Sequence, residues 1–409
     1  MKKMIFSAAA FALVAVSSIA LAPTNAEAIP AFARQTGAAC LSCHFQEIPA
    51  LTAFGRSFKM NAFTDVGDQA LVEDDGMSIP ATLNATVVIR PNVVQTKTTT
   101  TTGVTTTAKS IVYGDQVILI AGRMGTNTGA FVELGGGAFG NHQFMNSFDV
   151  GGMKVGVSYY NTGFGEDAGL QLSNVWGQHG GTNNGRFTSA NQNIMKSNAL
   201  AGVADNIAGL TAWVGNDMGA IQAGLIAPSD GVAWGVNGNS TFTAAKMVRA
   251  NGFFDVGGLS LGVGGILIGG NVGSFGQFIA AQQLKMERTG LEASLEGEVG
   301  GMGFGLYGDV ASAKKSTATE TNNYNTSLTD NLKGWAVRGQ VEPIHGLLLM
   351  AGVGNTQVGT KTDRLHLGAS YSVYQNFVIA LRQENAKNKT AAGLVSRTKT
   401  TTLDVEALM

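Results

Sequence analysis

The segment Leu291-Glu-Ala-Ser-Leu-Glu-Gly-Glu-Val299 alternates apolar and polar side chains at every second residue. A period of two places one set of side chains on each face of a β-strand. The same alternation runs through residues 302–310, 364–373 and 377–384, and only Gln375-Asn376 and their neighbours separate the last two. The sequence therefore predicts a series of neighbouring antiparallel strands.

Two features favour a transmembrane barrel over a large soluble sandwich or solenoid, which would show the same alternation. Ionisable residues occur in the polar sets of consecutive strands, whereas a soluble barrel of this size would need a dry interior. The connections also alternate between short and long, as they do in outer-membrane barrels. The short turns are at 342–346 and 375–376, and the long polar segments, which we interpret as extracellular loops, are at 96–109, 176–198, 227–241, 312–331 and 386–398.

Residues 79–409 provide enough chain for roughly sixteen to eighteen spanning strands of about ten residues each. We predict about sixteen, a size that leaves an aqueous lumen unless something fills it. The last strand, Thr402–Met409, places Leu403, Val405, Ala407 and Met409 on one face. The predicted location is the outer membrane of a Gram-negative bacterium, with membrane lipid around the barrel.

Composition agrees with an exported β protein. Only 13% of the 409 residues are charged, glycine occurs 56 times, and the formal net charge is -1. This balance gives no indication of nucleic-acid binding or of a polybasic membrane patch. Beyond residue 28, no uninterrupted apolar run has the length of a spanning helix.

The start of the chain has the pattern of an export signal. Lys2 and Lys3 precede an apolar stretch from Met4 to about Ala22, and Ala26-Glu27-Ala28 supplies the small-x-small pattern of a cleavage site. We therefore expect residues 1–28 to be a signal peptide. A retained membrane anchor is the alternative, which the alanine and serine content and the cleavage pattern disfavour.

The motif Cys40-Leu-Ser-Cys43-His44 carries the clearest chemistry, and it contains the only two cysteines of the chain. This spacing is the attachment signature of a c-type haem. The two sulfurs would form thioethers with the vinyl groups, and His44 would bind the iron as the proximal ligand. A disulfide would leave His44 unexplained, a zinc site would need a second ligand pair, and a thioredoxin-like pair would need a βαβ pattern. We therefore predict one covalently bound haem c.

Residues 29–64 form the predicted monohaem cytochrome c domain, with one short α-helix from Pro49 through Asn61 that places Leu51, Phe54 and Phe58 on one stripe. Residues 65–78 are rich in Asp and Glu and are interpreted as an acidic linker to the barrel at 79–409. Roughly three dozen residues are too few to enclose a haem alone. The cytochrome domain is therefore predicted to be a plug inside, or across the mouth of, the barrel.

The second ligand of the haem iron has several candidates. Met60 follows the motif on the short helix, and a methionine opposite a histidine would raise the potential, although most methionines simply pack in cores. His366 is the alternative, because strand alternation directs it to the lumen. His142 and His179 lie near predicted loops, and His345 lies in a turn. Water or an open position is also compatible with the sequence.

Several charged residues are candidates for further roles. Arg34, Arg56 and Lys59 are possible partners of the haem propionates, because cationic side chains bind carboxylates well. They are equally compatible with solvation or with pairing to acids of the lumen. Glu292, Glu296 and Glu298 could line a path for iron(II), but acidic side chains are common in the lumens of porins, and we interpret them as lumen polarity.

The N-terminal segment resembles a known family. The residues that carry the likeness are Pro30-Ala-Phe-Ala-Arg34-Gln-Thr-Gly37, Cys40-Leu-Ser-Cys43-His44-Phe-Gln46, Pro49-Ala-Leu51 and Phe54-Gly-Arg-Ser-Phe-Lys59. They resemble the fused cytochrome–porins of iron-oxidising bacteria, although Asn61-Ala62-Phe63 stands where a glycine and a tyrosine are common. The likeness covers about a tenth of the chain.

This resemblance implies an outer-membrane iron(II) oxidase, in which iron(II) is the electron donor and a periplasmic cytochrome or similar carrier is the acceptor. Oxidation outside the cell is chemically sensible, since iron(III) precipitates near neutral pH. No catalytic residue is predicted beyond the haem site. Two other functions remain open at this point: a diffusion porin with a haem-bearing plug, and an outward electron conduit to an external acceptor.

Overall fold

The computed structural model describes residues 30–48, 50–75, 77–135, 138–162, 169–175, 207–228, 243–274 and 283–409. The predicted signal peptide, the predicted loop at 176–198 with His179, and residues 229–241 of the next predicted loop lie outside these ranges.

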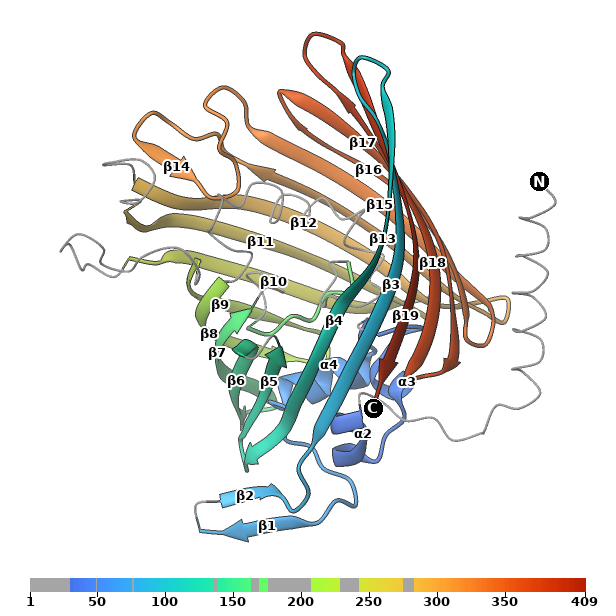
Figure 1. The fold of residues 1–409 in the computed structure, drawn as a ribbon. Coiled ribbons are helices and arrows are strands. Elements are labelled where there is room, and N and C mark those ends of the chain that lie inside the picture. Colours follow the sequence, from blue (N-terminus) through green and yellow to red (C-terminus); the bar gives the residue numbers. More distant parts are fainter. Residues whose placement is uncertain are drawn as a thin grey trace.

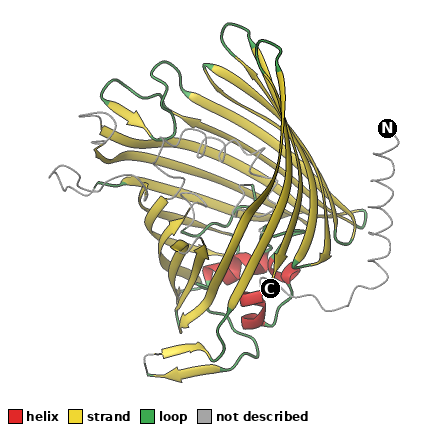
Figure 2. Ribbon diagram, in the orientation of Figure 1, coloured by secondary structure: helices red, strands yellow, loops and turns green. Residues whose placement is uncertain are grey.

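The described strands close into one barrel, drawn in Figures 1 and 2. Sixteen long antiparallel strands form its wall, as predicted, and the three-residue β14 adds a short parallel pairing to β12. The last strand pairs with the first, Leu403 opposite Val93, which closes the ring. The bounds are β3 Ala85–Thr99, β4 Thr105–Gly125, β5 Thr128–Gly135, β6 Ala138–Val150, β7 Met153–Thr162, β8 Ile207–Asn216, β9 Gly219–Pro228, β10 Ala245–Val256, β11 Leu259–Ser274, β12 Gln283–Val299, β13 Met302–Ala313, β14 Glu320–Asn322, β15 Leu332–Ile344, β16 Leu347–Val358, β17 Thr360–Tyr374, β18 Phe377–Lys389 and β19 Val395–Leu408.

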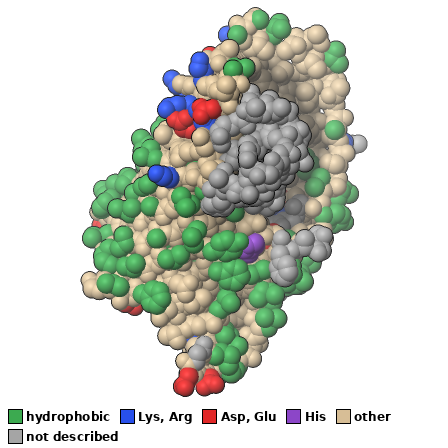
Figure 3. All heavy atoms as spheres, turned by 90° about the vertical axis from the view of Figure 1, so that its left-hand side faces the viewer, with side chains coloured by type: hydrophobic (Ala, Val, Ile, Leu, Met, Phe, Trp, Pro, Cys, Tyr) green, Lys and Arg blue, Asp and Glu red, His purple; other side chains and the backbone are tan. Residues whose placement is uncertain are grey.

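The two faces of the wall differ as the alternation predicts. On β12, Leu291 is 64% exposed on the outside, whereas its neighbour Glu292 is 7% exposed on the inside. Apolar side chains spread over the outer surface in Figure 3. Exposure of one such side chain to water would cost about 1.5–3 kcal/mol relative to its burial. Contact with the apolar chains of membrane lipid avoids that cost. The outward set includes Val155, Leu210, Ile221, Leu225, Val263, Leu267, Leu306, Val310, Val337, Leu349, Val353, Leu367 and Leu381.

Two of the predicted extracellular loops are largely strand. β3 continues to Thr99 and β4 begins at Thr105, so the predicted loop at 96–109 is mostly a hairpin that extends the wall. The predicted loop at 386–398 is likewise divided between β18 and β19. Threonine is polar enough to suggest a loop, but it is β-branched and pairs well across strands. The short turn at 375–376 is as predicted, since β17 ends at Tyr374 and β18 begins at Phe377.

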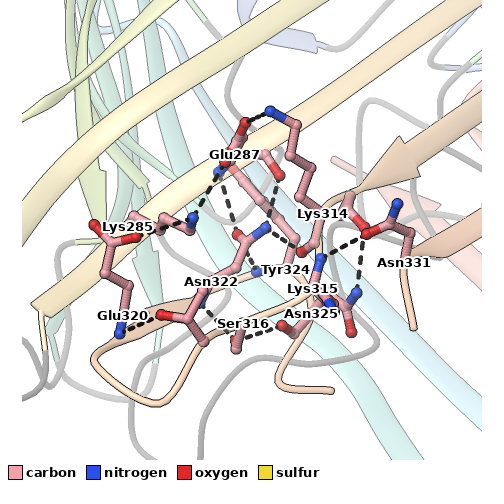
Figure 4. A network of polar contacts seen from close by, with 12 residues as sticks. Lys285, Glu287, Lys314, Lys315, Ser316, Glu320, Asn322, Tyr324, Asn325 and Asn331 are labelled. Carbon is pink, nitrogen blue, oxygen red and sulfur yellow. Dashed lines mark hydrogen bonds and ion pairs between the residues drawn. The ribbon is translucent and has the colours of Figure 1, made fainter. Parts of the chain in front are cut away.

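The predicted loop at 312–331 is ordered by a network of polar contacts, shown in Figure 4. Asn322, fully buried, donates to the carbonyl oxygens of Glu287 and Lys314. Lys285 on β12 lies 3.4 Å from the carboxylate of Glu320 on β14. Asn325 donates to the carbonyl oxygens of Ala313 and Asp330. These contacts hold the loop against β12.

Three short helices and a hairpin precede the barrel. The helices are α2 Pro30–Thr36, α3 Cys40–Cys43 and α4 Ala53–Met60. The hairpin pairs β1 Leu71–Asp74 with β2 Met77–Pro80, across the expected boundary between linker and barrel. The first barrel strand begins at Ala85 instead of 79. Of the described residues, no helix is long and apolar enough to cross a membrane.

The short helix differs from its prediction. It begins at Ala53, because the Thr52 side chain accepts a hydrogen bond from the Gly55 amide and caps the first turn. Phe58 is buried as expected, but Phe54 is 49% exposed and does not belong to the buried stripe. Arg56, which is not one of the three residues of the predicted stripe, is only 5% exposed. The buried face is therefore rotated from the one predicted.

The helices lie inside one end of the barrel, the end that also carries the hairpin and the C-terminus in Figure 1. They contact the wall around its circumference. The Leu41 amide lies 3.3 Å from the side-chain oxygen of Gln375, and the Ala31 amide donates to Thr86. The Gln340 side chain donates to Gln46 at 2.7 Å. Since these partners belong to the β17–β18 turn, β3 and β15, the helices plug the lumen.

Candidate functional site

The Cys40–Cys43 turn is a single turn of helix with its two cysteines unpaired by any disulfide. Cys40 is 1% exposed and Cys43 7%. The His44 amide donates to the Cys40 carbonyl at 2.8 Å, which places the histidine directly at the end of this turn. The three residues of the motif thus lie within one compact unit, as attachment of a haem to both sulfurs would require.

The His44 ring has a defined orientation. Its Nδ1 lies 3.1 Å from the carbonyl oxygen of Ala50, and the Phe45 amide donates to the same residue at 2.8 Å. A ligand histidine commonly donates its other ring N–H to such an oxygen, which fixes the tautomer and makes the free nitrogen a better ligand. With Nδ1–H directed at Ala50, Nε2 carries the lone pair. The donor set therefore fits a c-type haem.

Helix α4 packs closely on the motif. A Cβ at Gly55 would overlap the carbonyl oxygen of Cys43, so glycine is required for the two helices to approach this closely. The Thr52 amide donates to the same carbonyl at 2.9 Å. Burial, helped by the charge of Asp65, raises the pKa of the Cys43 thiol to about 11. The thiol therefore stays protonated at neutral pH in the protein without haem.

The three predicted propionate partners all contact protein oxygens. Arg34 donates to the Ala85 carbonyl, and Lys59 lies 3.3 Å from the side-chain oxygen of Gln171. Arg56 donates to the Leu51 carbonyl at 3.0 Å and lies over the Phe253 ring at 3.9 Å. Desolvation lowers the pKa of Arg56, and the charge of Glu296 opposes that effect. The charge of the lumen acid Glu296 thus acts on Arg56, and the propionate role stays a prediction for all three.

The other predicted site residues are distributed along the lumen. Met60 is 3% exposed and packs in an apolar cluster with Phe58, Met145 and Trp213, between α4 and the wall. His366 is fully buried on the inner face of β17. Nothing described brings Met60 into contact with His44, and its ligand role stays a prediction.

The three predicted lumen acids have different surroundings. Glu292 contacts Arg249, and Glu296 accepts from Asn174 at 2.8 Å. Glu298 is exposed beside the turn that joins β12 to β13. The first two are therefore lumen polarity with protein partners, as we interpreted them.

Two polar residues outside the motif hold the plug in place. Gln35, fully buried, donates to the carbonyl oxygens of Phe63 and Asp65 at 2.6 and 2.9 Å, and accepts from the Arg123 amide at 2.9 Å. Asn174 accepts from the Leu51 amide at 2.6 Å and donates to the Leu51 carbonyl at 2.9 Å. Sequence reasoning missed both, because each partner is 28 to 123 residues away along the chain.

Glycines of the wall make room for the plug. A Cβ at Gly129 of β5 would overlap the carbonyl oxygen of Ala62, and one at Gly122 of β4 would overlap the side-chain oxygen of Gln35. At Gly129 the wall and the plug are therefore complementary at backbone distance, and a side chain there would require the plug to shift.

The lumen is apolar above part of the plug. Inward positions on β10, β11 and β12 carry Met247, Ile266, Ile268, Leu284 and Met286, each at most 5% exposed. Together with Tyr307 and Tyr324 they form one cluster within the barrel. The interior described here is thus a packed core over much of its wall rather than a uniformly polar lining.

Comparison with known proteins supports the barrel architecture. An anion-selective porin from Comamonas acidovorans shares 12% identity with the chain, at a TM-score of 0.51, covering 80% of this chain and 99% of that one. OmpT of Vibrio cholerae, as a loop L8 deletion mutant, has 11% identity, a TM-score of 0.47 and coverage of 82% and 100%. A BenF-like porin from Pseudomonas fluorescens Pf-5 has 10% identity, a TM-score of 0.47 and coverage of 82% and 99%.

No protein-family model matches this sequence, and no curated protein matches it. At these identities the structural likeness concerns the fold, and no residue role passes from those porins to this chain. The closed barrel with its apolar outer belt is an outer-membrane porin-like fold, and the protein belongs in the outer membrane of a Gram-negative bacterium.

Proposed function

We propose that this protein transfers electrons across the outer membrane through one haem c, attached to Cys40 and Cys43 and bound by His44. The observation that carries the proposal is the His44 ring, whose Nδ1 faces the Ala50 carbonyl oxygen at 3.1 Å beside two unbridged thiols inside the barrel. When bound, the haem iron would supply a one-electron redox centre.

The plug gives this centre its place in the membrane. The hydrocarbon layer is about 30 Å thick, so a single redox group must lie within the barrel to be approached from both sides. The chain's own residues perform the supporting task, since Gln35 and Asn174 hold the plug by hydrogen bonds.

The electron donor in this proposal is iron(II), and the acceptor is a periplasmic cytochrome or similar carrier. Both rest on the resemblance of residues 30–59 to the cytochrome–porins of iron-oxidising bacteria. An outward conduit would use the same site with the opposite direction of flow, so the direction has to be measured.

The test uses intact cells that express the full chain. Soluble iron(II) added outside should convert the haem absorption spectrum to the reduced form, and a His44→Ala variant should not respond. A spectrum that stays oxidised with iron(II), but becomes reduced with dithionite, would rule out iron(II) oxidation. Mass spectrometry of the purified protein checks the earlier step, since a covalent porphyrin must be found on the peptide with Cys40 and Cys43.

A diffusion porin with a haem-bearing plug is the second candidate, favoured by the barrel architecture itself. One structural neighbour is described as an anion-selective porin. The helices across one end of the lumen and the apolar cluster inside it argue against a wide aqueous path. The conductance of the purified protein in a planar lipid bilayer distinguishes the two candidate functions. A large steady conductance supports a diffusion porin, and the absence of conductance supports a lumen blocked by the plug.

A further inference from the structure

A group of cations lies on the outer surface of the adjacent strands β17, β18, β19, β3 and β4. Leu381, Leu403, Val93 and Ile111 lie opposite one another in the register of the last four strands, and each is 41–70% exposed on the outside. Side chains an even number of residues away on the same strand share that face. Further along, this face carries the cations that we call the basic patch: Lys97, Lys109, Lys361, Lys387, Lys389, Arg397 and Lys399.

The basic patch lies at the end of the barrel away from the plug. The β17–β18 turn contacts the plug through Gln375, and Lys361 is at the opposite end of β17. Figure 1 shows these strand ends on the far side of the barrel from helices α2, α3 and α4. Short turns join strands at the plug end, such as Asp217-Met218 between β8 and β9, and outer-membrane barrels have their short turns on the periplasmic side. The basic patch therefore faces the cell exterior.

The basic patch begins where the apolar belt ends. Beyond the apolar row, the next outward row is polar and consists of Gln383, Thr401, Gln95 and Lys109. Lys97 and Lys399 follow two residues further along their strands, at a distance of about 6.6 Å. A bilayer has a polar headgroup region on each side of its hydrocarbon layer. The cations nearest the belt therefore lie at the depth of the lipid headgroups.

Cations of the basic patch oppose one another across neighbouring strands. The opposed pairs are Lys97 with Lys399, Lys387 with Arg397, and Lys361 with Lys389. Like charges in directly opposite positions destabilise a sheet. Of the outward residues on β17, β18, β19 and β3, all of which the structure describes, only Asp363 is acidic, and its carboxylate lies 2.9 Å from Lys361. An anion bound between these strands would offset the repulsion.

Composition gives no sign of this arrangement. The formal net charge of the chain is -1, so the cations are gathered on one side of a nearly neutral protein. Lys97 belongs to the first strand of the barrel and Lys399 to the last, and only the closure of the ring brings them together. The basic patch is therefore a product of the barrel topology.

We propose that the basic patch binds the phosphate groups of lipid A, the phosphorylated glycolipid of the outer leaflet. Lysine and arginine form charge-assisted hydrogen bonds with phosphate. The acyl chains of the same molecule then lie against the apolar row of Leu381, Leu403 and Val93, next to the patch. A free anion or an acidic protein would use the cations alone, whereas a lipid fits both surfaces. The proposal goes beyond electron transfer and does not depend on the haem.

The test is native mass spectrometry of the purified, full-length protein in neutral detergent micelles, titrated with lipid A. Each basic residue near a membrane surface strengthens its attraction for anionic lipid, so the patch variant, Lys97→Gln with Lys399→Gln, should bind lipid A about thirtyfold more weakly. Lipid A with a single phosphate should bind the unchanged protein more weakly than the bisphosphorylated form. Phosphatidylcholine should bind the patch variant and the unchanged protein equally.

The matched control is Lys246→Gln with Lys315→Gln. Both lysines are exposed and lie at the same end of the barrel, on β10 and after β13, and their loss should leave the affinity for lipid A unchanged. The melting temperature in lipid-free micelles checks folding. The patch variant relieves a like-charge repulsion, so it should melt no lower than the unchanged protein. Lys387→Gln with Arg397→Gln should reproduce the loss of lipid A binding independently.

Equal affinity of the patch variant and the unchanged protein for lipid A overturns the proposal. An equal loss of affinity in the control variant also overturns it, because it would indicate attraction by overall charge. The melting temperature of the unchanged protein should rise with lipid A and not with inorganic phosphate. An equal rise with inorganic phosphate would assign the basic patch to a free anion instead of a lipid.

Discussion

Replacement of Gln35 by alanine tests whether the plug is held by the hydrogen bonds described above. The Gln35 side chain is fully buried and makes four hydrogen bonds. It donates to the carbonyl oxygens of Phe63 and Asp65, and it accepts from the Arg123 amide and, at 3.2 Å, from the Asn84 side chain. At about 1 kcal/mol each, their loss should weaken docking of the plug by about 4 kcal/mol. Since 1.4 kcal/mol is a factor of ten, the undocked population should rise by about three orders of magnitude.

Native-state hydrogen exchange measured by mass spectrometry is the assay. Peptides from residues 30–65 should lose about a thousandfold of their protection in Gln35→Ala, while the strands β10–β13 keep theirs, because local opening does not require the barrel to unfold. Gln95→Ala is the matched control, since Gln95 is exposed on β3. Protection within threefold of the unchanged protein would show that these bonds do not hold the plug.

Three further results are expected. Gly129→Ala should lower the melting temperature, because its Cβ would overlap the Ala62 carbonyl oxygen, whereas Gly269→Ala should not, because it meets no atom within 4 Å; equal temperatures would contradict the close fit. In protein prepared without haem, the pKa of Cys43 is raised to about 11, so the neutral thiol contributes to the free energy of unfolding. This contribution is complete below pH 9 and is lost as the pH rises through 11. The free energy of unfolding, measured by denaturant titration between pH 8 and 12, should show this loss. The Cys43→Ser variant should not show it. Met60→Leu conserves volume in an apolar cluster and should cost less than about 1.5 kcal/mol by denaturant titration; a loss of several kcal/mol would indicate a bond that packing does not provide.

Alternation along single strands predicted the strands, and the ionisable inward residues together with the alternating short and long connections predicted that they form a membrane barrel. On β12 and β13 the outward and inward sets are those expected, because in a closed sheet each residue has only two possible sides. Hydrocarbon thickness sets the strand length, and so the chain length allowed roughly sixteen to eighteen strands, of which we predicted about sixteen. The threonine-rich segments before Thr99 and after Thr105 were assigned to a loop, since polarity cannot distinguish a loop from a strand that continues into water.

The candidate site was predictable only where it is local. Cys40, Cys43 and His44 lie within five residues of sequence, so their proximity was predictable, and their role in binding a haem stays a prediction. The contact of Gln35 with Arg123 spans 88 residues, and that of Asn174 with Leu51 spans 123. Phe54 was placed on one stripe with Phe58 but is exposed, and the buried face of the helix carries Gly55, Arg56, Phe58 and Met60 instead, which local periodicity does not indicate.

The burial of both thiols within a closed ring constrains biogenesis. Cys40 and Cys43 are at most 7% exposed, and the ring is completed only when β19, the last strand made, pairs with β3. A maturation enzyme that must reach the sulfurs could not do so once the cylinder is sealed around them. In the proposed function, haem attachment would therefore have to precede closure of the ring, and the chain would carry its haem before the last strand pairs with the first.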